Sequence, residues 1–338
     1  MSAARILQYW TGSRVVVPRE EKLATQVFEA ARLRIPSRAE LVRVDPDRIL
    51  AVGGGQVTEV QVDRPVDEWP TRSIPITHAF PGAIPPLLGI GKSGEVYELD
   101  SDFSLRQIWE SGVMFAARID DSATIYHPET RFLFGTWVTE ANGKIRWRRR
   151  SYDLFLMAVD RTLLVSRSQG VVSTSSLDGS ERWSRPGQLQ LVADDLVWIY
   201  DFEKTRLVAI DLASGNEHAR IEFGMATASL RADASGRGHL LGHTHYWTID
   251  LSSGRVLTRY ELGDGPRVKA IRPVNDGLLV GSEQGIHVLP ALDGRGSVPE
   301  PVWRTEAWIS SLLPHQNGMV VVEGPIGDSM MLKWLAPR

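Results

Sequence analysis

RTLLVSRSQGVVSTSSLDGSERW, from Arg161 to Trp183, is the stretch of sequence that decides the fold of this chain. It holds a short apolar segment, a turn containing Gly170, a second β-prone segment, an Asp-Gly turn and a last segment that ends in Trp. Short apolar segments separated by Gly, Asp and Ser are typical of β-strands joined by tight turns. We therefore expect antiparallel strands here, with no helix between them.

The same pattern recurs along the chain about every 39 residues, which is the mark of a repeat architecture. Copies at residues 86–109 and 277–303 also end in Trp, and copies at 207–221 and 240–257 keep the Asp. Trp69, Trp109, Trp147 and Trp183 are 40, 38 and 36 residues apart, and Asp211, Asp250 and Asp293 are 39 and 43 apart. This regularity makes the Trp and the Asp-to-Gly turn packing and turn elements rather than catalytic groups.

Each repeat has room for a four-stranded sheet, which has two faces to bury and must stack against its neighbours. The sequence therefore predicts an all-β fold, a β-propeller with eight four-stranded blades, with seven blades as the alternative. The expected blades lie near residues 40–70, 80–110, 112–148, 152–184, 188–223, 226–260, 266–304 and 306–335.

The last repeat supplies only three strands, at residues 309–313, 319–323 and 330–334. We expect an N-terminal strand to complete it and close the propeller, either residues 5–10 or residues 14–17. Residues 19–34 between prolines predict a short capping helix. The expected organisation is thus residues 1–39 as closing strands and helix and residues 40–338 as propeller, together one structural domain.

Ala209, Asp211, Gly215 and Glu217 match the pattern A-x-D-x-x-x-G-x-E-x-x-W, although a small or charged residue stands at the Trp position. Over residues 40–335 the chain resembles the pyrroloquinoline-quinone-like (PQQ-like) repeat propellers, which include quinoprotein dehydrogenases and outer-membrane assembly lipoproteins of Bam type. The first would imply a quinone held by a Trp and a vicinal Cys pair over calcium, and the second an exported, Cys-anchored chain. The sequence has no Cys, so the resemblance leaves a scaffold with no cofactor.

The 338 residues carry a formal net charge of −3 and are 43% hydrophobic, an ordinary globular composition. This mild acidity gives no reason to expect nucleic acid or a membrane as partner. The N-terminal residues lack a secretory apolar core, and no long apolar run occurs. We therefore expect a cytoplasmic protein, monomeric by itself, with protein partners.

Gly89, Gly91 and Gly94 form a literal G-x-G-x-x-G. The dinucleotide fingerprint must open a helix, whereas residues 95–99 continue as a strand, so a hairpin turn is the better interpretation. His239, His243 and His245 would share one face of an unbroken strand. Alignment with the next repeat instead places His243 and His245 in a polar turn, without the further ligand that a metal site needs.

Arg146, Trp147, Arg148, Arg149 and Arg150 form the one sharp charge run, here called the basic segment. We expect it at the end of an outer strand and in the following loop. Arginines around a Trp could bind an acidic protein surface, because Arg and Trp are enriched at binding hot spots. A solvated rim that pairs with nearby acids is the alternative. His243 and His245 are expected on the same face, and they complete the candidate partner-binding residues.

The leading functional hypothesis is a non-enzymatic bacterial scaffold that presents one face to a protein partner. Such propellers resemble those encoded beside AAA-type ATPase and von Willebrand A domain proteins in conflict systems, or immunity proteins. The alternative is a small-molecule-binding propeller or a metal-dependent hydrolase at the channel mouth, with acids such as Asp153, Asp194, Asp195 and Asp276 near blade starts.

Overall fold

The computed structural model describes most of the chain. The described residues are 6–8, 27–36, 39–45, 48–79, 87–100, 102–120, 123–128, 135–140, 144–150, 154–159, 161–167, 170–175, 177–224, 228–233, 235–242, 245–261, 268–274, 277–282, 285–290, 300–305, 307, 309–316, 318–326 and 329–337. They fall into two compact units, unit 1 (Met1–Ala4, Val16–Ile74 and Thr227–Arg338) and unit 2 (Arg5–Val15 and Pro75–Ala226).

Unit 1 contains four sheets of four antiparallel strands each. The first is β3 (Glu40–Asp45), β4 (Arg48–Gly53), β5 (Gln56–Val60) and β6 (Thr71–Ser73), with the 3-10 helix η1 (Val66–Glu68) before β6. The next two are β23 (Ala228–Ala232), β24 (Arg237–Gly242), β25 (His245–Asp250) and β26 (Val256–Glu261), and β27 (Val268–Val274), β28 (Gly277–Ser282), β29 (Gly285–Pro290) and β30 (Trp303–Arg304). The fourth is β31 (Ile309–His315), β32 (Gly318–Ile326), β33 (Ser329–Pro337) and β2 (Val27–Pro36).

Unit 2 contains four more sheets of the same build. Two are β7 (Ile76–Ala79), β8 (Leu87–Gly91), β9 (Val96–Leu99) and β10 (Leu105–Trp109), and β11 (Val113–Asp120), β12 (Ala123–Pro128), β13 (Gly135–Glu140) and β14 (Ile145–Arg150). The others are β15 (Leu154–Val159), β16 (Thr162–Arg167), β17 (Gly170–Ser175) and β18 (Glu181–Pro186), and β19 (Gln188–Ala193), β20 (Leu196–Asp201), β21 (Arg206–Asp211) and β22 (Glu217–Glu222). The short β1 (Ile6–Gln8) adds to this last sheet beside β19.

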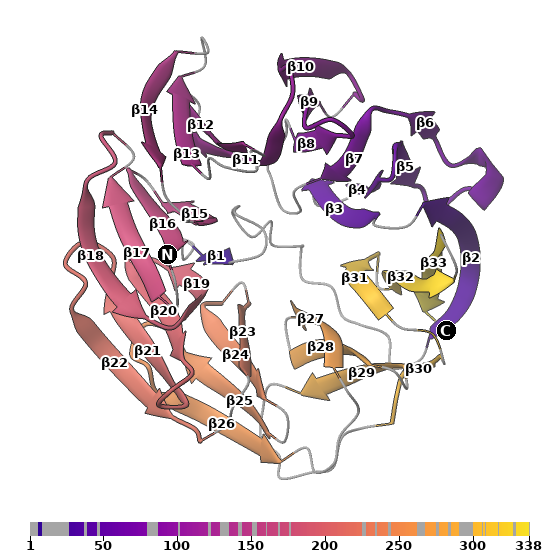
Figure 1. Cartoon of the computed structure of the whole chain (residues 1–338). Coiled ribbons are helices and arrows are strands. Elements are labelled where there is room, and N and C mark those ends of the chain that lie inside the picture. Colours follow the sequence, from indigo (N-terminus) through magenta and orange to yellow (C-terminus); the bar gives the residue numbers. More distant parts are fainter. Residues whose placement is uncertain are drawn as a thin grey trace. The chain divides into compact units, whose positions relative to one another are not determined.

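Within each unit the sheets fan out, with their first strands converging and their last strands at the outer edge (Figure 1). The middle strands are buried on both faces; in β20 every residue from Val197 to Asp201 is buried. The outer strand β22 buries only Ile221 of its six residues. Burial therefore decreases from the middle strands to the outer strand, because the middle of each sheet is covered by neighbouring sheets on both sides.

The core of unit 2 lies between successive sheets. One apolar cluster joins Met157, Leu164 and Trp183 from one sheet with Leu189 and Val197 from the next. The eight sheets begin and end within a few residues of the expected blades. The fold is therefore the predicted all-β propeller with eight four-stranded blades.

The strand that completes the last sheet is β2, which pairs antiparallel with β33 from Val27 opposite Pro337 to Pro36 opposite Ser329. An N-terminal strand completes the last sheet as predicted, but the predictions that residues 5–10 or 14–17 form it and that a helix reaches residue 34 were wrong. Helix-forming residues favoured the helix, but the burial of residues 27–36 alternates with period two, so pairing with β33 overrode local propensity. Two ion pairs of Lys333 stabilise the contact between β2 and β33. The Lys333 Nζ lies 3.0 Å from Glu29 Oε2 and 2.7 Å from Glu323 Oε2.

Candidate functional site

The whole basic segment lies in β14, the outer strand of its sheet, paired with β13 from Val138 opposite Trp147 to Gly135 opposite Arg150. The expectation that it runs into a loop was therefore wrong. The reason is that β13 continues to Gly135 and offers backbone partners along the full length. The side chains of Arg149 and Arg150 lie outside the described part of the structure.

Trp147 packs against the turn of the following sheet. A methyl group placed on Gly179, whose φ is +75°, would lie 3.2 Å from the indole ring. Trp183 repeats the arrangement one sheet later, against the turn at Gly215. The prediction that the periodic Trp residues and Asp-Gly turns are packing and turn elements is confirmed for these two pairs. Trp147 thus has a structural role, and the arginines beside it are left as the segment's candidates for partner binding.

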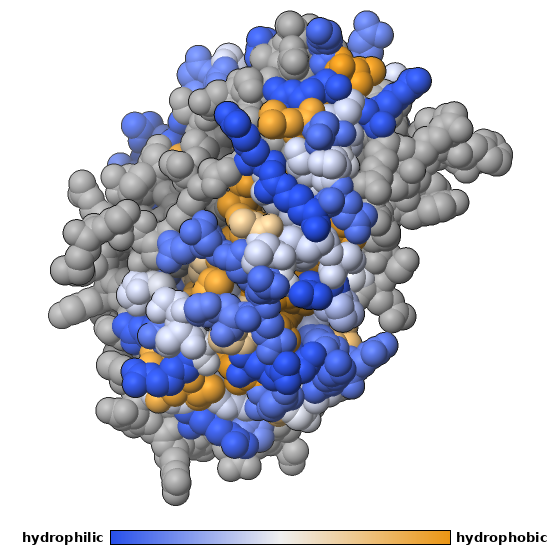
Figure 2. Space-filling model, turned by 90° about the vertical axis from the view of Figure 1, so that its left-hand side faces the viewer, coloured by the Kyte–Doolittle hydropathy of each residue, from blue (hydrophilic) through white to orange (hydrophobic). Residues whose placement is uncertain are grey.

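The neighbours of Trp147 on β14 point to the surface. Arg148 is exposed and Arg146 is half-buried, while Lys144 is exposed just before the strand. Ile145 is 43% exposed, and Leu177 in the turn of the next sheet is 50% exposed. Figure 2 shows a face on which hydrophilic residues predominate around small apolar patches. Exposed cations beside exposed apolar side chains can bind an acidic protein surface.

His245 begins β25, and His243 lies outside the described residues. The His245 ring stacks on Trp247 with 5.4 Å between centroids, and its Nε2 lies 2.8 Å from Nη2 of Arg259. Because arginine only donates, Nε2 accepts this hydrogen bond. The Arg259 guanidinium also lies 5.8 Å from the Trp247 centroid. His245 is therefore held in a small cationic and aromatic cluster at the start of its strand.

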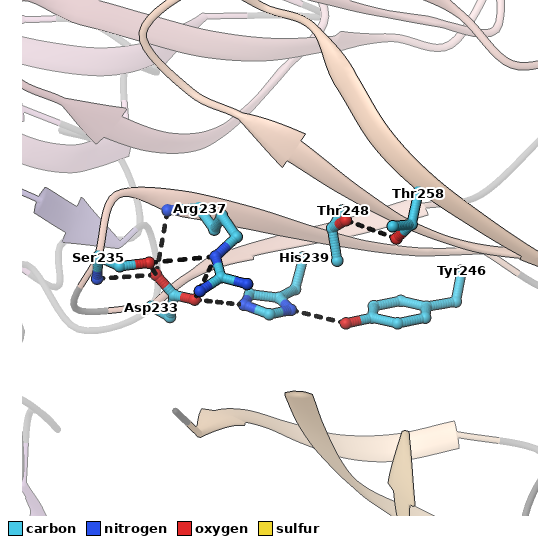
Figure 3. A network of polar contacts seen from close by, with 7 residues as sticks. All are labelled: Asp233, Ser235, Arg237, His239, Tyr246, Thr248 and Thr258. Carbon is cyan, nitrogen blue, oxygen red and sulfur yellow. Dashed lines mark hydrogen bonds and ion pairs between the residues drawn. The ribbon is translucent and has the colours of Figure 1, made fainter. Parts of the chain in front are cut away.

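His239 on β24 is fully buried and belongs to a network of polar contacts (Figure 3). Its Nε2 lies 3.0 Å from Asp233 Oδ2, and its Nδ1 lies 2.8 Å from the hydroxyl of Tyr246. Asp233 Oδ1 also accepts hydrogen bonds from the backbone of Ser235 and Arg237. Sequence reasoning missed this network. The sequence signal that could have indicated it is Asp233-x-Ser235. This pattern is typical of a turn in which the Asp carboxylate accepts a hydrogen bond from the backbone two residues later.

Burial raises the pKa of Asp233, but hydrogen bonds from His239 and Ser235 outweigh it and the pKa is lowered overall. The ionised carboxylate therefore accepts the Nε2 proton of His239. Nδ1 of His239 is hydrogen-bonded to the Tyr246 hydroxyl on the other side of the ring. Asp233, His239 and Tyr246 are all buried, so the hydrogen bonds among them have a structural role.

The other singled-out motifs are turns. Gly89 and Gly91 belong to β8 and Gly94, with φ +80°, to the turn before β9, which confirms the hairpin interpretation. Asp211 accepts from both the backbone and the hydroxyl of Ser214, which lowers the pKa of Asp211.

The structure describes only two of the four acidic residues that were candidates for a hydrolase site. Asp194 and Asp195 are exposed in the turn between β19 and β20, whereas Asp153 and Asp276 lie outside the described residues. Across the part of the chain that the structure describes, no three His, Asp or Glu side chains gather as a metal site would require.

Comparisons with known proteins extend this picture only at the level of fold. No protein-family model matches the chain, and no curated protein matches by sequence. Among solved structures, BamB from Moraxella catarrhalis aligns with TM-score 0.61 and 13% identity over 91% of this chain and 99% of its own. Sqt1 from Saccharomyces cerevisiae aligns with TM-score 0.59 and 12% identity over 95% and 100%. The resemblance to PQQ-like repeat propellers is thereby confirmed in fold.

A third solved structure, Hsv2 from Kluyveromyces lactis, aligns with TM-score 0.51 and 12% identity over 70% of this chain and 86% of its own. Within the described residues, no helix is long and apolar enough to cross a membrane.

Proposed function

We propose that this chain is a non-enzymatic, monomeric protein-interaction scaffold of the bacterial cytoplasm, which binds an acidic protein through the outer strands of unit 2. The observation that carries the proposal is the surface of β14, where Arg148 is exposed beside Ile145 and Lys144. The neighbouring outer strand β18 adds the exposed Arg182. Arginine suits such a surface because its planar guanidinium binds carboxylates in a bidentate way.

The exposed side chains and the packing of β14 support a role in binding. Ile145 is exposed on β14, and Leu177 is exposed two residues before Gly179 in the turn against which Trp147 packs. Exposed apolar side chains with polar neighbours match a contact area that has an apolar centre and a polar rim. Trp147 is fixed against Gly179, so β14 is held rigidly and loses little entropy on binding. We further propose that the partner belongs to a multi-component conflict, defence or immunity system, as the sequence resemblance implies.

The test is a partner-binding measurement with the variant R148A/R149A/R150A. We expect its unfolding free energy to stay within about 1 kcal/mol of wild type, because an exposed arginine such as Arg148 contributes little to stability. Affinity for a co-purified partner should fall by about 2 kcal/mol, roughly thirtyfold, with a weaker salt dependence. The control R64A/R72A/R255A removes the same charge from exposed positions of unit 1. Equal binding by both variants at low and high salt would refute β14 as the binding surface.

A further inference from the structure

A short fifth strand, β1, adds to one sheet of unit 2. Residues Ile6–Gln8 pair antiparallel with β19, from Ile6 opposite Ala193 to Gln8 opposite Leu191. The order of the sheet is β1-β19-β20-β21-β22, and Figure 1 shows β1 beside β19, where the first strands of the unit converge. The inner edge of β19 therefore accepts an extended segment through antiparallel backbone pairing.

β1 differs from the other strands of this sheet in its length and in its place in the sequence. It has three residues, whereas β19, β20, β21 and β22 have six each. Those four strands come from one continuous stretch, residues 188–222, and β1 comes from near the N-terminus. Because a three-residue pairing supplies few backbone hydrogen bonds, β1 can leave β19 without disturbing the pairing of the other four strands.

The side chains of β19 are packed inside the protein. Leu191 and Val192 are fully buried, and Ala193 is 5% exposed. Val192 belongs to an apolar cluster that also contains Val197 of β20. What β19 offers to a fifth strand is consequently its backbone N–H and C=O groups. These groups pair with an extended segment that has no proline at the pairing positions.

Two acidic residues lie at one end of this edge. Asp194 and Asp195 are exposed in the turn that follows β19. Because the pairing is antiparallel, the N-terminal end of a fifth strand lies at this end of β19. A basic residue just before the strand is therefore favoured by charge, and the sequence has Arg5 at that position, before Ile6.

We propose that the inner edge of β19 binds an extended segment of a partner protein, in which a basic residue precedes two or more apolar, β-prone residues. The segment becomes the fifth strand of the sheet, a mode of recognition in which backbone hydrogen bonds supply the affinity. β1 takes this place in the free protein and competes with the partner, because Arg5 followed by Ile6 and Leu7 has the same chemistry. The site is separate from β14 and does not rest on the proposed function.

The first test measures the binding of a fluorescent peptide by anisotropy. The peptide has the sequence of residues 4–9, and the proteins are the full chain and a deletion variant that lacks residues 1–8 and therefore β1. We expect the deletion variant to bind the peptide about tenfold more tightly than wild type or better, because no tethered strand competes. Its Tm should stay within about 3 °C of wild type, since the other four strands remain.

Two altered peptides test the chemistry of recognition. The peptide with L7P/Q8P should not bind, because the N–H groups of adjacent residues point to opposite sides of a strand and this change removes the one that faces β19. The peptide with R5E should bind the deletion variant about threefold more weakly or worse at low salt, and the difference should shrink at high salt.

A reversible cross-link tests whether β1 and the peptide occupy the same site. The chain has no Cys, and Leu7 lies opposite Val192, so a disulfide in L7C/V192C holds β1 on β19. We expect the oxidised variant to lose peptide binding and dithiothreitol to restore it. V192C alone is the matched control, because it has the same buried substitution without a second thiol. Oxidation should leave peptide binding by V192C unchanged.

Several results would overturn the proposal. These are no peptide binding by the deletion variant, equal affinity of the deletion variant and wild type, equal binding of the altered and unaltered peptides, or unchanged binding by oxidised L7C/V192C. A large loss of Tm in the deletion variant would make β1 a structural strand. Wild-type dimers that disappear in the deletion variant would assign the edge to a second copy of the chain.

A last measurement separates this site from β14. The variant R148A/R149A/R150A should bind the peptide as wild type does. Loss of peptide binding in that variant would contradict a separate site at β19. Loss of partner binding at β14 alone has no bearing on β19, so the two proposals fail separately.

Discussion

Trp183 and Gly215 are in direct contact across two successive sheets. The indole of Trp183, on β18, covers Gly215 in the turn between β21 and β22 so closely that a Cβ there would lie 2.5 Å from its Cγ. The indole Nε1 donates to the carbonyl of Leu212 at 2.8 Å, and Nη2 of Arg185 donates to the carbonyl of Gly215 at 2.6 Å. The outer strand β18 is thus bound by packing and hydrogen bonds to the turn between β21 and β22 of the next sheet.

The substitution Gly215→Ala tests this contact. Gly215 has φ +73°, so alanine adds backbone strain of about 1 kcal/mol and a clash that overpacking measurements put at about 1–3 kcal/mol. We expect the free energy of unfolding to fall by about 2–4 kcal/mol in urea. Gly224→Ala is the control, because Gly224 has φ +64° and nothing within 4 Å of its Cβ position. Equal losses in both variants would show that only backbone strain matters.

The variant Asp233→Asn tests the buried network. It replaces the acceptor of His239 Nε2 in a site where His239 is fully buried, and we expect a loss of about 2–4 kcal/mol at pH 7. The pKa of Asp233 is lowered in the folded state. Its stabilisation is therefore present above the unfolded pKa, about 3.9, and is lost as pH falls through the folded value.

The difference in stability between wild type and Asp233→Asn should accordingly shrink when denaturation is measured at pH 3 instead of pH 7. Tyr246→Phe is the control, because it removes only the hydroxyl that is hydrogen-bonded to His239 Nδ1 and should cost about 1 kcal/mol. A difference that stays constant with pH would show that Asp233 does not act through its charge.

Deleting residues 1–36 tests the strand that completes the last sheet. The deletion removes β2 and exposes the backbone edge of β33, so we expect aggregation or a large drop in Tm. Deleting residues 1–17 removes β1, whose pairing with β19 covers three residues, and should have a much smaller effect. Light scattering and calorimetry distinguish the two. The same large drop for both deletions would contradict the role of β2.

Lys333→Met tests the ion pairs between β2 and its neighbours. It leaves Glu323, whose side chain is 3% exposed, without its charged partner, and we expect a loss of about 3–5 kcal/mol. Burial lowers the pKa of Lys333, but Glu323 and Glu29 outweigh it and the pKa is raised overall. The stabilisation is therefore complete below the unfolded pKa of about 10.4 and is lost as pH rises through the folded value. Arg32→Met is the control, since the Arg32 side chain is 68% exposed in its pair with Glu29.

The repeat made the eight sheets predictable because its signals are local. The turn at Gly215 and the strands on either side of it are set by residues within a few positions, and the copies agree with one another. The sequence placed the basic segment correctly on an outer strand but predicted the end of that strand too early. The reason is that the length of β14 depends on how far β13 runs beside it. The partner-binding role of that segment stays a prediction.

The sequence by itself determined the number of sheets, their limits and the packing role of Trp147 and Trp183, because period and turn chemistry are written in neighbouring residues. Only the tertiary structure decided that β2 completes the last sheet. Residues 27–36 combine helix-forming residues with a strand-like alternation, and they form a strand because they pair with the edge of β33. It also decided that β3 and β31 are neighbours within unit 1. These strands lie more than two hundred positions apart in the sequence, and a local pattern carries no information about distances set by the stacking of whole sheets.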